Sequence, residues 1–160
     1  MIFYEYKSLL HILEENKGNK INIEDIKTQY ISLLSQLTNT TLITNEEFVN
    51  RIIQISNIGT IIICYFVNIE NQKIIIVGSG TIIYEPKIIH NCKYVGHIED
   101  IVVQDLHRSK GIAKKLIKEL TNLAYERNCY KVILDCNRKL QNFYEKIGFT
   151  NNGLQMSLYF

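Results

Sequence analysis

One stretch of the chain, from residue 94 to residue 124, constrains the fold more than any other. Residues 94–103 form an apolar run typical of a strand, a polar loop follows, and residues 112–124 carry an apolar stripe with helical spacing. The loop holds the pattern Arg108-x-x-Gly111-x-Ala113. Because a helix start offers free amide donors and the positive end of the helix dipole, phosphate oxygens bind there readily. The stretch predicts a strand, a phosphate-binding loop and a helix, although the pattern alone also fits an ordinary basic loop.

Periodicity predicts further elements on both sides of this stretch. Helices are expected over residues 24–37 and from Thr44, where Thr-Asn-Glu-Glu is a capping-box pattern. The tail over residues 153–160 is a candidate last strand, and no element is predicted for the first twenty residues. Two more strands are expected at residues 61–69 and 74–84. A short strand is expected at residues 131–136, and a helix at residues 140–147. The middle of the chain thus begins with consecutive strands and continues with strands that alternate with helices. This order predicts an α/β fold with a mixed central sheet flanked by helices.

Length and composition exclude several classes of protein. The 160 residues fit one domain, residues 1–160, and the net charge of +2 argues against a nucleic-acid partner. The four cysteines form no Cys-x-x-Cys pair, so reduced thiols in a cytoplasmic protein are expected rather than a metal site or disulfides. Residues 52–69 carry no charge, but polar residues interrupt them, and no signal peptide opens the chain. No membrane association is therefore predicted.

Several separate motifs surround the loop. They are His-Ile-Glu-Asp-Ile-Val-Val at 97–103, Asn-Cys-Tyr-Lys at 128–131, Leu-Asp-Cys at 134–136 and Phe-Tyr-Glu-Lys-Ile-Gly-Phe at 143–149. In this order they resemble the GNAT superfamily of N-acetyltransferases and, more narrowly, the glucosamine-6-phosphate N-acetyltransferases. The resemblance implies the GNAT fold, with a mostly antiparallel sheet, and acetyl-CoA as cosubstrate. It also implies a cytoplasmic homodimer that acetylates glucosamine 6-phosphate directly, in a ternary complex, for UDP-N-acetylglucosamine synthesis.

The first group of candidate residues would bind acetyl-CoA. The loop can cradle the CoA phosphates through the charge of Arg108 and through the backbone amides of the next five residues, namely Ser109, Lys110, Gly111, Ile112 and Ala113. Many relatives have glycine in place of Ala113, which is also small. The pattern makes Ile101, Val102 and Val103 buried strand residues. The resemblance adds that their main chain binds the amides of pantetheine as another strand would.

Tyr144 is the candidate general acid and also a cofactor contact. Its helical spacing with Leu140 and Ile147 is equally typical of a core position. By the resemblance, this tyrosine faces the sulfur of CoA. A phenol with a pKa of about 10 can protonate a thiolate whose thiol has a pKa of about 8.5.

Three carboxylates stand in otherwise apolar strands. Alternation would place Glu99 and Asp100 on opposite faces, so no simple acid pair is expected from them. A buried carboxylate needs a partner, so each of these, like Asp135, is either a satisfied structural group or a ligand contact. By the resemblance, all three lie around the amino sugar, and Asp135 orients or stabilises the reacting amine.

The remaining candidates would contact the phosphorylated sugar. Lys87 and His90 match a Lys-x-Ile-His segment of the family and are candidate phosphate and sugar contacts, or else an ordinary polar turn. Thr38 matches a substrate-contacting threonine and is otherwise a polar residue at a helix end. Tyr130 and Lys131 match positions that reach the substrate of a neighbouring subunit, or they simply begin a strand.

One departure from the family leaves the substrate open. Relatives usually carry an arginine near the C-terminus that binds the sugar phosphate, whereas residues 155–160 contain no basic residue. An acetyltransferase for a polyamine or a protein amino group, and a non-catalytic acyl-CoA-binding module, are therefore alternatives. Lys87 and His90 favour an anionic substrate over a cationic one. The presence of Tyr144 and Asp135 argues against a silent module.

Overall fold

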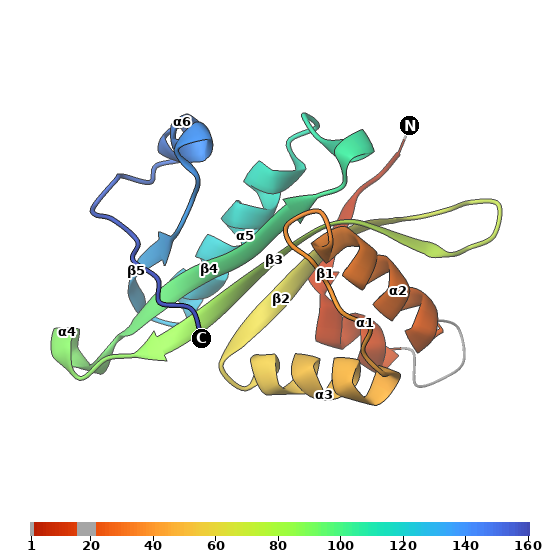
Figure 1. Cartoon of the computed structure of the whole chain (residues 1–160), viewed down its shortest axis with the longest axis horizontal. Coiled ribbons are helices and arrows are strands. Elements are labelled where there is room, and N and C mark those ends of the chain that lie inside the picture. The colour runs from red at the N-terminus through yellow and green to blue at the C-terminus, as the bar shows by residue number, and fades with distance from the viewer. Residues whose placement is uncertain (1, 16–21) are drawn as a thin grey trace.

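The computed structural model describes residues 2–15 and 22–160, and its centre is one five-stranded sheet (Figure 1). The strands lie in sequence order across the sheet. β1 to β4 pair antiparallel, and β5 pairs parallel with β4. The predicted mixed and mostly antiparallel sheet is confirmed. The strands are β1 (Glu5–Ser8), β2 (Gly59–Val67), β3 (Ile74–Pro86), β4 (Tyr94–Val103) and β5 (Cys129–Leu134).

Helices cover both faces of this sheet. In Figure 1, α1, α2 and α3 lie in front of the sheet and the long helix α5 lies behind it. Two short 3-10 turns, η1 (Asp105–His107) and η2 (Arg138–Leu140), precede α5 and α6. Within the described ranges, no helix combines the length and the apolar character needed to cross a membrane. The helices are α1 (Leu9–Glu15), α2 (Ile23–Leu34), α3 (Asn45–Ser56), α4 (Ile89–Cys92), α5 (Ile112–Glu126) and α6 (Gln141–Glu145).

The two faces of the sheet bury two hydrophobic clusters. On β2, Ile61 and Ile63 pack with α1, α2 and α3, whereas Ile62 and Cys64 pack with α5. This division follows from the two-residue period of a strand. Burial of each aliphatic side chain contributes about 1.5–3 kcal/mol to the free energy of folding. The helices on both faces therefore stabilise the sheet. The apolar stripe of α5 that enters the second cluster consists of Ile112, Leu116, Ile117, Leu120 and Ala124.

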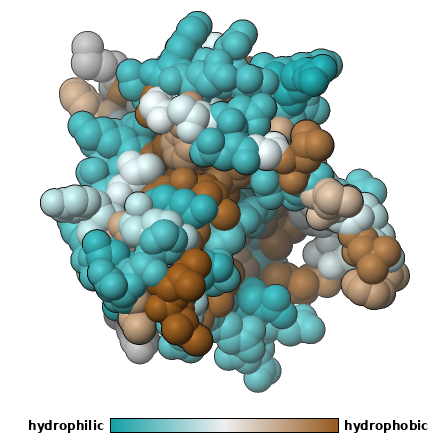
Figure 2. Space-filling model, turned by 90° about the vertical axis from the view of Figure 1, so that its left-hand side faces the viewer, coloured by the Kyte–Doolittle hydropathy of each residue, from teal (hydrophilic) through white to brown (hydrophobic). Residues whose placement is uncertain are grey.

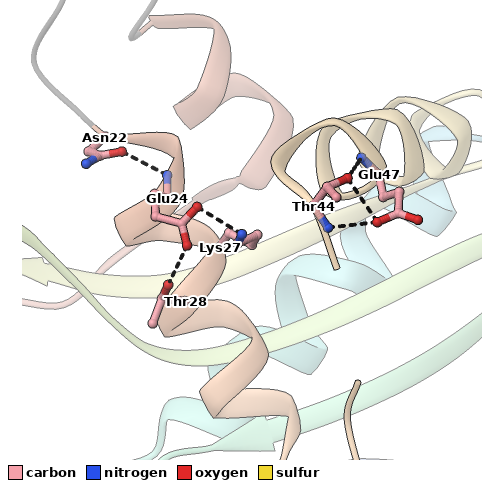
Figure 3. A network of polar contacts seen from close by, with 6 residues as sticks. All are labelled: Asn22, Glu24, Lys27, Thr28, Thr44 and Glu47. Atoms are coloured by element: carbon pink, nitrogen blue, oxygen red, sulfur yellow. Dashed lines mark hydrogen bonds and ion pairs between the residues drawn. The ribbon is translucent and has the colours of Figure 1, made fainter. Parts of the chain in front are cut away.

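Side-chain caps begin α2 and α3 (Figure 3). Asn22 accepts a hydrogen bond from the Glu24 amide at 2.9 Å. The Thr44 hydroxyl accepts one from the Glu47 amide at 3.1 Å, and the Glu47 carboxylate accepts one from the Thr44 amide at 2.7 Å. The capping box predicted from the sequence is therefore confirmed. It begins α3 at Asn45 and leaves residues 35–44 as a loop.

The last predicted strand is absent, so that prediction is wrong for the single chain. Residues 150–160 form neither helix nor strand. Leu154, Met156 and Leu158 of this tail are each at least 79% exposed. Their apolar alternation has the period of a strand, but a strand also needs a neighbour to satisfy its backbone groups. The helix expected over residues 24–37 likewise stops early, at Leu34, where α2 ends.

Candidate active site

A β-bulge in β4 shapes the centre of the site. Ser79 of β3 faces Val102 of β4, and Thr81 faces Glu99, so two residues of β4 lie opposite Gly80 alone. One of them, Asp100, has a φ of 53°, outside the extended region. A bulge of this kind bends its strand and re-aims its side chains. The alternation expected of a regular strand therefore does not hold at Asp100.

The far half of β4 has an open edge. β5 pairs with β4 as far as Ile98 opposite Leu134, where β5 ends, while β4 continues to Val103. Figure 1 shows the chain leaving β5 toward α6 and away from β4. Within the part of the chain that the structure describes, no strand pairs with residues 99–103 on this side. These residues can therefore accept an extended ligand along their backbone.

The predicted phosphate loop follows this open edge directly. The Gln104 amide donates to the Val77 carbonyl at 2.8 Å, and α5 begins at Ile112 after Gly111, whose φ is 79°. The first helical hydrogen bond runs from the Lys115 amide to the Gly111 carbonyl at 3.0 Å. The amides of residues 112–114 thus precede the helical hydrogen-bond ladder and can face an anion. The strand, loop and helix expected from the sequence are confirmed here.

Two contacts of Arg108 stabilise the loop. Its Nε donates to the Val103 carbonyl at 3.0 Å, and its guanidinium forms an exposed ion pair with Asp105 at 2.7 Å. Both contacts hold the start of the loop against the end of β4. A direct contact between Arg108 and a phosphate stays a prediction.

Tyr144 lies on α6 in the hydrophobic cluster that also contains Val103 and Ile112. The side chain is 8% exposed, and its ring meets those of Phe143 and Phe149 edge to face at 5.0 Å and 6.0 Å between centroids. Burial, and to a smaller degree the nearby Cys136, raises the pKa of the phenol. The hydroxyl therefore keeps its proton at neutral pH, as a general acid must.

The bulge gathers negative charge. The pKa of Glu99 is raised by partial desolvation and then by the charges of Asp100 and Asp135. Partial desolvation also raises the pKa of Asp100. All three carboxylates are nevertheless exposed, so the expectation that they are buried in strands is wrong. The charge of Asp100 contributes, after burial, to the raised pKa of the buried Tyr30, which is about 12. Glu99 is thus within electrostatic reach of Asp100 and Asp135, and Asp100 is within reach of Tyr30 on α2.

A second group of candidates gathers at the β3–β4 hairpin. The ring of His90 lies 4.0 Å from that of Tyr130, and the Lys131 ammonium lies 5.7 Å from the Tyr130 ring. Lys87 forms an ion pair with Glu85. Figure 2 views the molecule from this side and shows a hollow with a hydrophobic floor beside the main body.

The two groups lie apart within one subunit. Lys131 of β5 pairs with Val95 of β4, and Glu99 is four residues further along β4 than Val95. At a rise of about 3.3 Å per residue, this places them about 13 Å apart along the strand. Thr38 is exposed in the loop after α2, and no contact in the described chain joins it to either group. The structure thus brings together the carboxylates, and separately the hairpin candidates.

Comparison with known proteins decides the family. Residues 40–149 match the model of the acetyltransferase (GNAT) family. The chain is 40% identical to the glucosamine 6-phosphate N-acetyltransferase of Arabidopsis thaliana over 148 residues, which cover 92% of this chain and 98% of that protein. The chain belongs to the GNAT acetyltransferases.

One further relative and one crystal structure narrow the position of the chain within the GNAT family. A glucosamine 6-phosphate N-acetyltransferase of Candida albicans is 38% identical over 137 residues, with 86% and 91% of the two chains covered. The crystal structure of the Arabidopsis thaliana enzyme superposes with a TM-score of 0.80 at 34% identity, with 99% of each chain covered. The chain is therefore a member of the glucosamine 6-phosphate N-acetyltransferase group of GNAT proteins.

The sequence assigned no role to two residues, Glu85 and His97, that lie beside the candidate Lys87. Glu85 pairs with Lys87 and also contacts Nε2 of His97 at 2.9 Å. These contacts lower the pKa of Glu85, with the Lys87 hydrogen bond as the larger cause. The only signal in the sequence was that Glu85 and Lys87 stand two positions apart, which places both on one side of an extended segment. Among the described residues, no group of three or more His, Cys, Asp or Glu side chains is placed to hold a metal ion.

Gly111→Val should weaken CoA binding about 5- to 100-fold. A Cβ at this position would meet no atom within 4 Å, so the cost comes from the positive φ rather than from a clash. Left-handed backbone costs about 1–3 kcal/mol for residues that avoid it, whereas Asn tolerates it. Calorimetry should find that Gly111→Asn binds CoA nearly as the wild type does. If the folded Val and Asn variants bound CoA with equal affinity, the loop would not be part of the cofactor site.

Proposed function

We propose that this protein transfers the acetyl group of acetyl-CoA to the amine of glucosamine 6-phosphate, by direct attack in a ternary complex. The observation that carries the proposal is the bulged strand β4. Its end leads into the phosphate loop at Val103, and its bulge presents Glu99 and Asp100 four and three residues earlier. One strand thus connects a site for the acyl donor with a site for the acceptor amine.

The cofactor would lie along the open edge of β4. The loop amides of residues 109–113 would hold the diphosphate at the start of α5. The main chain of residues 101–103 would hydrogen-bond the amides of pantetheine as a neighbouring strand does. The thioester would then lie beside Tyr144, which shares a hydrophobic cluster with Val103 and Ile112.

The chemistry requires a proton to leave nitrogen and one to reach sulfur. The neutral amine attacks the thioester carbonyl, the carbon–sulfur bond breaks, and the departing thiolate takes the proton of the Tyr144 hydroxyl. Asp135, with Glu99 and Asp100 nearby, would orient the amine and stabilise the positive charge that forms on its nitrogen. The nitrogen then loses its proton to water, and water reprotonates Tyr144. No strong base is needed when the amine binds in its neutral form.

The phosphate of the sugar would meet the cations of the hairpin. Lys87, His90 and Lys131 all lie at that end of the sheet, and Tyr130 packs on His90. They would take the place of the C-terminal arginine that this sequence lacks. The product, N-acetylglucosamine 6-phosphate, would serve UDP-N-acetylglucosamine synthesis in the cytoplasm.

A homodimer would complete the site. Within one subunit Lys131 lies about 13 Å along the strand from Glu99, and a second copy would bring its own Tyr130 and Lys131 to the same sugar. The exposed tail also lacks a strand partner in the described chain. Pairing with a second copy would bury its apolar side chains, and obligate interfaces are hydrophobic in this way.

Leu158→Asp should shift the dimer toward an 18.7 kDa monomer, because a charge would enter the apolar interface of the tail. Ile69→Asp is the matched control, since Ile69 is 85% exposed at the β2–β3 turn. Sedimentation velocity should show the shift for Leu158→Asp alone. A wild-type protein that sediments as a monomer would contradict the dimer.

Tyr144→Phe should keep CoA affinity and lower turnover. Packing between Phe143 and Phe149 is preserved and only the hydroxyl is lost, while general acid catalysis contributes about 10²–10⁴-fold. Tyr125→Phe, at a side chain 86% exposed on α5, should leave turnover unchanged. Wild-type turnover in Tyr144→Phe, with chemistry shown to limit the rate, would return Tyr144 to a packing role.

Lys87→Ala should raise KM for glucosamine 6-phosphate while KM for acetyl-CoA stays nearly constant. A charge-assisted hydrogen bond contributes about 1.5–3 kcal/mol, so kcat/KM should fall about 10- to 100-fold. Lys93→Ala, on the same hairpin, is the matched control and should change neither constant.

The same assay of thiol release tests the substrate class. Glucosamine lacks the phosphate, so it should be a poor substrate that is almost indifferent to Lys87→Ala. Equal losses with both sugars would make Lys87 structural. Faster turnover of spermidine than of glucosamine 6-phosphate by the wild type would favour a polyamine acetyltransferase, and no turnover of any amine would favour a binding module.

A further inference from the structure

Three aromatic rings from distant parts of the chain meet beside the phosphate loop. They belong to Tyr4, just before β1, to Phe66 on β2 and to His107 on η1. The Tyr4 hydroxyl and Nδ1 of His107 are hydrogen-bonded at 2.8 Å, across 103 positions of sequence. The Tyr4 ring meets Phe66 edge to face at 6.3 Å, and Phe66 stacks on His107 at 5.7 Å. The motifs around the loop gave none of these residues a role.

The His107 ring is the part of η1 that packs against the rest of the protein. Asp105 and Leu106, the other residues of this turn, are exposed, whereas His107 is half-buried. The His107 amide donates to the Gln104 carbonyl at 2.8 Å, and the Arg108 amide donates to the Asp105 carbonyl at 3.2 Å. The packing of the ring therefore helps to fix where the backbone enters the loop at Arg108, together with the contacts of Arg108 itself.

His107 is suited to an anchoring role rather than to direct phosphate binding. Burial, and to a smaller degree Lys110, lowers the pKa of its ring, so the ring is neutral at pH 7. Its Nδ1 is already paired with Tyr4. A neutral and engaged ring offers no cationic charge to a phosphate, but it holds its own backbone in place.

We propose that Tyr4 is a positioning residue for acetyl-CoA, which acts through His107 to hold the turn that presents the phosphate loop. The inference rests on the proposed function, because it takes the loop as the site of the CoA phosphates. It extends the cofactor machinery to a residue that lies well outside the residues matched by the family model, 40–149. The segment before β1 would thus contribute to cofactor affinity without touching the cofactor.

Tyr4→Phe tests this directly, since it keeps the ring contacts and removes the hydroxyl. The net free energy that an ordinary hydrogen bond contributes corresponds to about a 2- to 10-fold change in the Kd for CoA. Calorimetry should show CoA binding weakened by that factor, and kinetics should show the loss in KM for acetyl-CoA rather than in KM for the amine. Tyr6→Phe is the matched control, because Tyr6 is also half-buried and loses only its hydroxyl, on β1. That variant should bind CoA as the wild type does.

S-acetylpantetheine, which lacks the diphosphate and the adenosine, separates loop positioning from general damage. The kcat/KM for this thioester should be the same in the wild type and in Tyr4→Phe. An equal loss with acetyl-CoA and S-acetylpantetheine would overturn the proposal. A wild type that binds no CoA would refute the proposed function itself, whereas wild-type CoA affinity in Tyr4→Phe would refute only this inference.

A double-mutant cycle shows whether Tyr4 acts through His107. His107→Ala should weaken CoA binding at least as much as Tyr4→Phe, and adding Tyr4→Phe to it should cause no further loss. His107→Asn keeps a polar atom near the position of Nδ1 and should recover part of the affinity. Additive losses in the cycle would mean that Tyr4 acts elsewhere, and would overturn the proposal.

Discussion

The site depends on one departure from regular strand geometry, the left-handed residue Asp100 in β4. Up to Ile98 this strand is paired on both sides, by β3 and by β5. Beyond the bulge it stays paired with β3, and no strand of residues 2–15 and 22–160 pairs with its other side. The sheet can therefore be rigid at its centre and still offer backbone groups to a ligand. Non-glycine residues adopt positive φ at an energetic cost, and such strain persists where the surrounding structure enforces it.

The charges of the two residue groups complement a zwitterion. Glucosamine 6-phosphate carries an amine at one position and a phosphate at another, and the protein presents carboxylates at the bulge and cations at the hairpin. Within one subunit these groups are separated by about 13 Å along the strand. In the proposed dimer, substrate recognition would depend on assembly, because the basic side chains of one copy would lie beside the carboxylates of another. The ion pair between Lys87 and Glu85 would keep the lysine oriented before the phosphate arrives.

Local features were predictable from the sequence, and non-local ones were not. The capping box at Thr44 and the loop ending at Gly111 depend on residues within a few positions of each other, so their patterns predicted them correctly. The bulge at Asp100 depends on the register of β4 against Gly80, which no short pattern encodes. The same holds for the contact between Glu85 and His97 across two strands. The tail over residues 153–160 has the alternation of a strand, but a pattern cannot supply the neighbour that a strand requires.

Gly80 of β3 lies where β4 and α5 pack closely together. A Cβ on this residue would come within 2.4 Å of the Ile101 side chain and 3.0 Å of Leu120. Ile101 belongs to the bulge, and Leu120 belongs to the face of α5 that covers the sheet. A side chain at this position would have to push aside the ends of the Ile101 and Leu120 side chains, on the strand and the helix of the proposed cofactor site. The addition of a single methyl group in the interior would therefore disturb both elements at once.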